Sequence, residues 1–262
     1  MAHTPHTWDP DRYLAYADER GRPFLDLLAR VGAERPADVV DLGCGPGNLT
    51  RLLADRWPGA RIRGLDSSPE MVEAARRDVA GVEFGVADLR DWAGADDQVD
   101  VIVAHATLQW LPDHLDLLPD LGGRLRPGGW LAFQVPGNFE EPSHTIRTEI
   151  AAREPYAAHT RGVAVPASHD PADYLAVLAG LGLEVDVWET TYLHVLTGED
   201  PVFRWVSGTG ARPTLQALPD DLRADFESEF RARLREAYPD DGHGVVLPFR
   251  RIFAVGRRGQ HS

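Results

Sequence analysis

Val39-Val40-Asp41-Leu42-Gly43-Cys44-Gly45-Pro46-Gly47-Asn48 is the most informative stretch of this sequence. Its apolar start predicts a buried strand, its glycines predict a sharp turn, and the residues from Asn48 onward predict a helix. Glycine has no Cβ and therefore tolerates strained or crowded backbone positions. The N–H groups of such a turn can approach a ligand closely, and the positive end of the following helix points toward it. We expect an anionic or strongly polar ligand at this turn.

Acidic residues at the ends of three predicted strands indicate which ligand this is. Asp41 would repel a pyrophosphate but suits a ligand with an ammonium or sulfonium group. Asp66 ends the apolar run Arg61–Leu65, where a carboxylate commonly accepts hydrogen bonds from two ribose hydroxyls. Asp88 follows the run Val82–Ala87 and could accept a hydrogen bond from an adenine amine. Ribose, adenine and a cationic amino-acid tail together describe S-adenosylmethionine.

The turn also allows two other interpretations. It could be an ordinary strand–turn–helix joint, or it could bind NAD. The NAD fingerprint is G-x-G-x-x-G, whereas Gly43, Gly45 and Gly47 stand at alternate positions. A dehydrogenase tyrosine–lysine pair is also excluded, because the sequence contains no lysine.

Composition narrows the class of protein. The 262 residues are 43% hydrophobic and 26% charged, which is typical of a soluble globular chain. A net charge of −14 argues against nucleic acid and anionic membranes as partners. Cys44 is the single cysteine, so an internal disulfide is excluded and a reducing, cytoplasmic location is expected. With no signal peptide and no apolar run long enough to span a bilayer, we expect no membrane association.

Alternating strands and helices predict an α/β fold. Expected strands at 61–65, 82–87, 99–104 and 130–135 follow the first one. Expected helices cover Asn48–Trp57, a segment that starts at 67–70 with a capping serine before Pro69, and Leu115–Leu125, which stops at Arg126–Gly129. The pattern predicts a Rossmann-like, seven-stranded, mostly parallel sheet with helices on both faces. Ligands bind such sheets at the carboxyl ends of the strands, where the three acidic residues fall. Residues Tyr13–Val31 predict entry helices broken at Gly21-Arg22-Pro23.

The remainder of the chain is less regular. We expect one domain over 1–262, with the ligand-binding core inside 1–136. Segments 137–182 and 197–245 are expected to form a helical lid that contributes to the substrate site, with helices at Thr145–Ala152, Pro171–Leu181 and Leu222–Ala237. The final strands are expected at 183–196 and 246–256.

Asp41–Gly47, Asp66 and Asp88 resemble the motifs of class I S-adenosylmethionine-dependent methyltransferases. Further motifs resemble those of the trans-aconitate 2-methyltransferase family over nearly the whole chain. They are Trp8-Asp9-Pro10 with Tyr13, Glu19-Arg20, Arg22-Pro23, Leu108–His114, Glu141–His144, Glu184–Trp188, Thr190–Tyr192, Trp205-Val206, Thr209-Gly210, Arg212-Pro213, Arg251 and Phe253. Two residues depart from the family pattern: Gly21, where a larger residue is expected, and Arg250, where a proline is expected.

The resemblance implies methyl transfer to a carboxylate of trans-aconitate, which gives a monomethyl ester. Because a carboxylate is already ionised at neutral pH, this reaction needs no general base. Proximity and orientation are then sufficient, so we assign no catalytic residue. No cluster has the spacing of a zinc site, so no metal is expected.

The predicted site residues form two groups. Predicted to bind the cofactor are Tyr13, Asp41, Gly43, Cys44, Gly45, Asp66, Ser67, Met71, Asp88, Leu89 and His105. Predicted to bind the substrate are Gln109, Trp110, His144, His169, Tyr192, Trp205, Arg212 and Arg251. The two arginines are the chemical match for a small tricarboxylate, because a guanidinium binds a carboxylate through two parallel hydrogen bonds.

Two further functions remain open at this point. The acceptor could be another acid, or a hydroxyl or carbon nucleophile that needs His144 or His169 as a base. The chain could also bind S-adenosylmethionine without catalysing a reaction and contact a partner through its lid. We expect a monomer or a weak homodimer.

Overall fold

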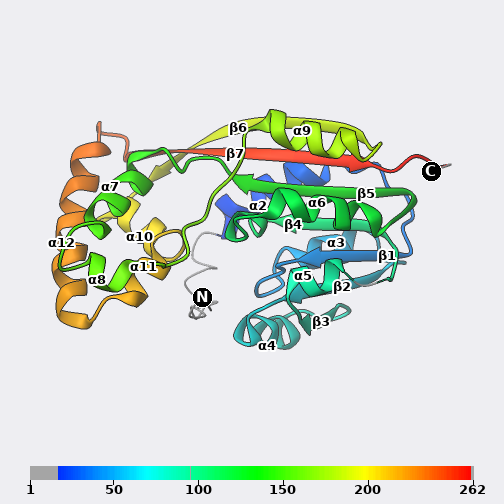
Figure 1. The fold of residues 1–262 in the computed structure, drawn as a ribbon, viewed down its shortest axis with the longest axis horizontal. Helices are drawn as coiled ribbons and strands as arrows, with labels where there is room; N and C mark the ends of the chain where they lie inside the picture. Colours follow the sequence, from blue (N-terminus) through cyan, green and yellow to red (C-terminus); the bar gives the residue numbers. More distant parts are fainter. Residues whose placement is uncertain (1–16, 95, 261–262) are drawn as a thin grey trace. The chain divides into compact units, whose positions relative to one another are not determined.

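A seven-stranded sheet organises the protein (Figure 1). The computed structural model describes residues 17–94 and 96–260, with side chains from Gly21 onward, so Tyr13 and the motif at Trp8 lie outside the described residues. Within this range the strands run in the order β3-β2-β1-β4-β5-β7-β6. They are β1 (Asp38–Leu42), β2 (Arg61–Asp66), β3 (Glu83–Val86), β4 (Val99–His105), β5 (Leu125–Pro136), β6 (Glu184–Leu196) and β7 (Val245–Arg257).

The pairing confirms the predicted mostly parallel sheet. The pairs β1–β2, β2–β3, β1–β4 and β4–β5 are parallel, and β5–β7 is antiparallel. Leu42 pairs with Leu65 of β2 and with Ala104 of β4, so the carboxyl ends of the three central strands lie at one edge of the sheet. The turn after β1 is therefore at the point where the strand order reverses direction, which is where α/β sheets bind ligands.

Helices cover this sheet on both faces. They are α2 (Ala17–Leu28), α3 (Thr50–Arg56), α4 (Pro69–Asp78), α5 (Leu89–Ala93), α6 (His114–Gly123) and α9 (Pro171–Gly180), with the 3₁₀ helix η1 (Leu108–Trp110) after β4. One core joins alternate residues of the central strands to α6 and α9, and a smaller one joins α4 to β3. Six of the seven residues of β4 are buried, as expected for a strand covered on both faces.

Two local predictions are wrong. The predicted break at Gly21-Arg22-Pro23 is absent, because α2 continues through Pro23. Burial of Phe24, Leu27 and Leu28 stabilises the helix there and outweighs the lost N–H donor of the proline. The predicted stop of α6 at Arg126–Gly129 is also misplaced. The helix ends at Gly123, and Arg126–Gly129 lies inside β5, where the pairing register with β4 shifts between Val99 and Val101.

The chain divides into two compact units. Unit 1 contains Gly137–Ala167 and Thr191–Arg250, and unit 2 contains the described residues of Thr7–Pro136, Ser168–Thr190 and Arg251–Ser262. The division falls inside β6 and inside β7. The helices of the described chain are all too short or too polar to form a transmembrane span.

Unit 1 is mainly helical. It contains α7 (Pro142–Ala151), α8 (Ala157–Thr160), α10 (Pro201–Ser207), α11 (Arg212–Ala217) and α12 (Asp220–Ala237). The helix α12 packs against α7 and α10, and α11 packs against α8 and α10. Aromatic side chains form the centre of this packing, since the rings of Phe203 and Phe226 both lie edge-on to that of Phe230.

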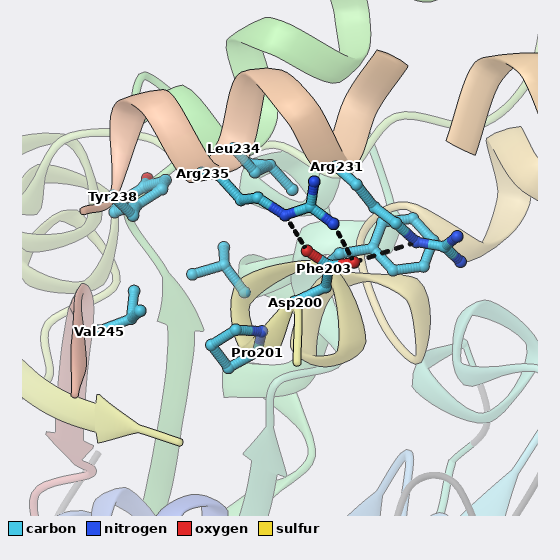
Figure 2. Close-up of a pocket in the computed structure, with 9 residues that line it drawn as sticks. Asp200, Pro201, Phe203, Arg231, Leu234, Arg235, Tyr238 and Val245 are labelled. Carbon is cyan, nitrogen blue, oxygen red and sulfur yellow. Dashed lines mark hydrogen bonds and ion pairs between the residues drawn. The ribbon is translucent and has the colours of Figure 1, made fainter. Parts of the chain in front are cut away.

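Asp200 connects α10 to α12. Its backbone has φ +45° and ψ +50°, a left-handed conformation that aspartate tolerates better than most residues. Arg235 donates to both oxygens of its carboxylate, at 2.6 and 2.8 Å, and Arg231 lies 3.8 Å away (Figure 2). Because only 9% of the Asp200 side chain is exposed, the bidentate contact is shielded from water on the aspartate side.

We expect Asp200→Asn to lower the Tm by about 3 °C, because the amide keeps the shape and the backbone preference but loses the charge that two guanidiniums face. Differential scanning calorimetry measures this shift. The matched control is Glu229→Gln, which removes the more exposed pair with Arg153 and should leave the Tm unchanged. Equal shifts in the two variants would contradict a special role for Asp200.

Candidate functional site

The turn after β1 is built from three glycines in left-handed conformations. Gly43, Gly45 and Gly47 have φ values of +72°, +54° and +79°. At Gly43 a Cβ would lie 2.1 Å from the hydroxyl oxygen of Thr107 and 2.7 Å from its Cβ. The turn therefore packs directly on the segment that follows β4, and only glycine allows this close approach.

Asp66 holds this turn to the start of α4. One carboxylate oxygen accepts a hydrogen bond from the Gly45 N–H and the other from the Ser68 N–H, both at 2.9 Å. Burial raises the pKa of Asp66, and these backbone hydrogen bonds oppose the shift. A carboxylate has about four acceptor positions. Because the side chain is only partly buried, the two remaining positions could accept hydrogen bonds from a ligand diol.

Asp41 lies deeper than Asp66. Only 2% of it is exposed, and its carboxylate accepts a 2.6 Å hydrogen bond from the Thr50 hydroxyl. Burial, together with the charge of Asp66, raises the pKa of Asp41 to about 7, although the Thr50 hydrogen bond favours the ionised form. A cation next to Asp41 would lower this pKa again. The sequence did not identify Thr50, because a threonine in the first turn of a helix is common.

The other predicted cofactor residues lie around the same edge of unit 2. Asp88 caps α5 by accepting from the Arg90 N–H at 2.8 Å, and the capping serine predicted before Pro69 is confirmed by the Met71 N–H bond to Ser68. Ser67 and Asp88 are exposed and Leu89 is half-buried, whereas Met71 is buried. The buried His105 packs against Phe24 with ring centroids 5.3 Å apart.

Cys44 is unsuited to act as a nucleophile. Its thiol is 6% exposed and donates to the Gly45 carbonyl at 3.6 Å. Burial, with added repulsion from Asp41 and Asp66, raises the pKa of the Cys44 thiol far above neutrality. The thiol therefore stays protonated, and Cys44 serves as a small buried residue of the turn.

Three of the predicted substrate residues lie near the carboxyl ends of β4 and β5 in unit 2. Gln109 and Trp110 belong to η1, and the Gln109 amide donates to the Ala106 carbonyl at 2.5 Å. Ala106 has φ +53°, which is rare for a residue with a side chain and marks local backbone strain next to the candidate site. Arg251 is 3% exposed and donates to the side-chain oxygen of Gln134 at 3.0 Å. Gln134 was not identified from the sequence.

His169 belongs to a buried hydrogen-bonded cluster in unit 2. The His114 Nδ1–H donates to the Leu111 carbonyl, so its Nε2 accepts from the Tyr174 hydroxyl, both at 2.8 Å. That hydroxyl accepts from the backbone N–H of His169 at 3.1 Å, and the His169 ring lies 5.0 Å from the His114 ring. These contacts give His169 a structural role, and its binding of substrate stays a prediction.

The remaining predicted substrate residues lie in unit 1. Tyr192 and Trp205 are 4% and 2% exposed and flank the ring of His194, with centroids at 6.2 and 4.8 Å. His144 approaches Gly210 so closely that a Cβ there would lie 2.9 Å from the imidazole Cε1. Arg212, at the start of α11, is 8% exposed. Tyr192 and Trp205 therefore contribute to the core of unit 1, and their binding of substrate stays a prediction.

Arg147 was not identified from the sequence, yet it donates to a residue of the Thr209-Gly210 motif. It is 3% exposed, and its guanidinium donates to the Gly210 carbonyl and, at 3.4 Å, to the Thr148 hydroxyl. Burial lowers the pKa of Arg147 to about 10. Burial also lowers the pKa of His144 to about 3, and the charge of Arg147 adds to this effect.

Comparison with known proteins identifies the family. A methyltransferase domain model matches residues 39–129. The trans-aconitate 2-methyltransferase of Streptomyces avermitilis is 52% identical, and the match covers 96% of this chain and 97% of that protein. This chain belongs to the trans-aconitate 2-methyltransferase family. The predicted family, enzyme class and cofactor are thereby confirmed: it is an S-adenosylmethionine-dependent methyltransferase.

Solved structures with lower identity support the fold alone. A methyltransferase-like protein from Bacillus halodurans is 13% identical, with a TM-score of 0.58 over 91% of this chain and 99% of that one. The [4+2]-cyclase SpnF is 16% identical, with a TM-score of 0.56 over 99% of this chain and 88% of that one. Because the same fold supports a cyclase, membership of the trans-aconitate 2-methyltransferase family rests on the sequence match and not on the shape.

We expect Gly43→Ala to lower the Tm by about 6 °C or more, because the added methyl group collides with the Cβ of Thr107 and no rotamer change relieves the contact. Gly45→Ala is the matched control. It has the same left-handed strain but no atom within 4 Å of the added Cβ, so a shift of only about 2–4 °C is expected. Thermal unfolding of the ligand-free proteins measures both, and equal shifts would contradict the close packing described for Gly43.

Proposed function

We propose that this enzyme transfers the methyl group of S-adenosylmethionine to a carboxylate of trans-aconitate and releases the monomethyl ester. The observation that carries the proposal is the 52% identity to a trans-aconitate 2-methyltransferase over 96% of the chain. This match extends beyond the methyltransferase domain at residues 39–129 and includes unit 1.

The turn after β1 supports the proposed position of the cofactor. The free acceptor positions of Asp66 suit the ribose hydroxyls, and Asp41 suits the ammonium group of the methionine moiety. Asp88, at the start of α5, suits the adenine amine. In its ionised form Asp41 would place a negative charge next to a cationic ligand in a nearly dry site, where the attraction is far stronger than in water.

The chemistry requires little beyond binding and orientation. The attacking carboxylate oxygen carries its own negative charge, and the sulfonium methyl is already activated, so the residues act by alignment and by exclusion of water. Of the two histidines considered as bases for another acceptor, His144 is unsuited, because burial lowers its pKa to about 3 and makes it a weak base. An acceptor hydroxyl or carbon would need a stronger base than His144 provides.

A tricarboxylate acceptor also needs positive charge in a protein whose net charge is −14. We propose that Arg251 and Arg212, both more than nine-tenths buried, contribute to this binding. In unit 2 the Gln134 oxygen fixes one N–H edge of the Arg251 guanidinium. A lid role for 137–182 and 197–245, a cytoplasmic location and a monomeric or weakly dimeric state stay predictions.

Mass spectrometry of the reaction products tests the proposal directly. Wild-type protein with S-adenosylmethionine should add one methyl group to trans-aconitate, and should react much faster with it than with cis-aconitate or citrate. Product that forms only with another acid would contradict the acceptor assignment but not the enzyme class. Cofactor binding without turnover on any acid would instead support a binding protein.

The affinity for S-adenosylmethionine should depend on pH through Asp41. Its raised pKa means that it binds a proton below about pH 7, and the ammonium of the cofactor requires the ionised form. Affinity should therefore rise with pH, approaching about tenfold per unit on the acid side. It should fall again above about pH 8, where the amino group of the cofactor loses its proton.

Isothermal titration calorimetry between pH 5 and pH 9 measures this profile. In Asp41→Asn the overall affinity should be lower and the rise on the acid side should be lost, while the decline above about pH 8 should persist. A wild-type affinity that does not change from pH 5 to pH 8, or an unchanged acid-side rise in Asp41→Asn, would contradict the assigned role of Asp41.

A further inference from the structure

A groove of about 320 Å³ lies entirely within unit 1. Residues of α7, α8, the segment after α8 and α11 line it, and none of them was predicted to be functional from the sequence. Its volume is at the lower end of the range for ligand pockets, which suits a small molecule.

Arg147 provides a buried positive charge in this groove. It is 3% exposed, and its polar partners are the neutral Gly210 carbonyl and Thr148 hydroxyl. Two nearby carboxylates of α7 and α12 pair with other arginines: Glu149 with Arg233, and Glu229 with Arg153. A guanidinium has five N–H donors, so Arg147 retains donors for a ligand.

The threonines of the groove differ in what they can offer a ligand. The Thr148 hydroxyl donates to the His144 carbonyl, and the Thr160 hydroxyl donates to the Ala151 and Tyr156 carbonyls. Neither of these two hydroxyls therefore has a proton left to donate to a ligand. Thr214 is 5% exposed and lines the groove, and nothing in the described part of the chain accepts its hydroxyl proton. Thr214 can thus donate to a bound anion.

The rest of the lining separates into a charged rim and an apolar wall. Arg161 is exposed and forms a 3.7 Å pair with the exposed Glu154, a contact weak enough to be exchanged for a ligand. The wall consists of small apolar side chains: Ala151, Ala152, Ala157, Val163 and Val165. An inorganic anion would leave this wall in contact with water, whereas a carbon skeleton would cover it.

We propose that this groove binds a small organic polycarboxylate. One carboxylate binds to Arg147 and Thr214, a second binds to Arg161 at the rim, and the carbon skeleton covers the alanine and valine wall. The low pKa of Arg147, about 10, reflects the cost of a buried charge that a bound carboxylate would offset. This inference rests on the proposed function in one respect only: the proposed acceptor, trans-aconitate, is itself a small organic polycarboxylate.

Isothermal titration calorimetry on the full chain without S-adenosylmethionine tests the proposal. The probes are trans-aconitate, its saturated analogue propane-1,2,3-tricarboxylate, and the neutral trimethyl ester of trans-aconitate. Both tricarboxylates should bind to the wild type and the ester should not. Arg147→Gln should weaken tricarboxylate binding by about tenfold or more, because it removes a charge-assisted hydrogen bond. Thr214→Val should weaken it by about threefold without changing the side-chain shape.

Arg153→Gln and Thr145→Val are the matched controls. Arg153 pairs with Glu229 next to α7, and the Thr145 hydroxyl donates to the Glu141 carbonyl outside the groove. Neither should change the affinity. The proposal is overturned if neither tricarboxylate binds to the wild type. It is also overturned if Thr214→Val and a folded Arg147→Gln bind like the controls, or if a control weakens binding as much as they do.

Steady-state methylation distinguishes the two sources of the ligand. If the groove holds the acceptor itself, Arg147→Gln raises the KM for trans-aconitate and propane-1,2,3-tricarboxylate competes with the acceptor. If it holds a separate carboxylate, binding weakens while the KM is unchanged. Arg147-dependent binding without methylation would refute the proposed function and leave the groove supported. Methylation without Arg147-dependent binding would support the proposed function and refute the proposed ligand of the groove.

Discussion

The Asp66 carboxylate is the contact on which the candidate cofactor site depends. It joins the Gly45 N–H of the turn after β1 to the Ser68 N–H at the start of α4, at 2.9 Å each. Parallel strands are held in register by their ladders, but the loops at their carboxyl ends are not, and a loop needs such a contact to keep one conformation. The same carboxylate that is proposed to bind ribose thus also fixes the glycine turn, so structure and binding share one residue.

Buried charge is the feature that we propose gives the protein its selectivity. Asp41 and Asp66 suit a cationic cofactor, and the buried guanidiniums of Arg147, Arg212 and Arg251 are each proposed to bind carboxylates. Exposed charges would be largely screened by salt and opposed by a net charge of −14. Burial reduces this screening, and the shifted pKa values of Asp41 and Arg147 are its measurable consequence.

Much of the fold could be predicted from the sequence, because strand–turn–helix patterns and the cap at Ser68 are local. The errors arose where tertiary packing outweighed local preference, as in the continuous helix through Pro23. The sequence also gave no indication of Gln134, Thr50 or Arg147. Their roles depend on which distant group each one meets: Arg251, Asp41 or the Gly210 carbonyl. In the sequence alone, a buried arginine on a helix cannot be distinguished from an exposed one, because its burial depends on how the helices pack.

Cys44 has a practical consequence. Its buried, protonated thiol is the only thiol in the chain, and the sequence has no lysine. A thiol-alkylating reagent can therefore react only when the glycine turn opens, so the alkylation rate reports how often it does. The natural chain already contains a single-site probe of loop opening, and S-adenosylmethionine bound at the turn would slow the labelling in proportion to its occupancy.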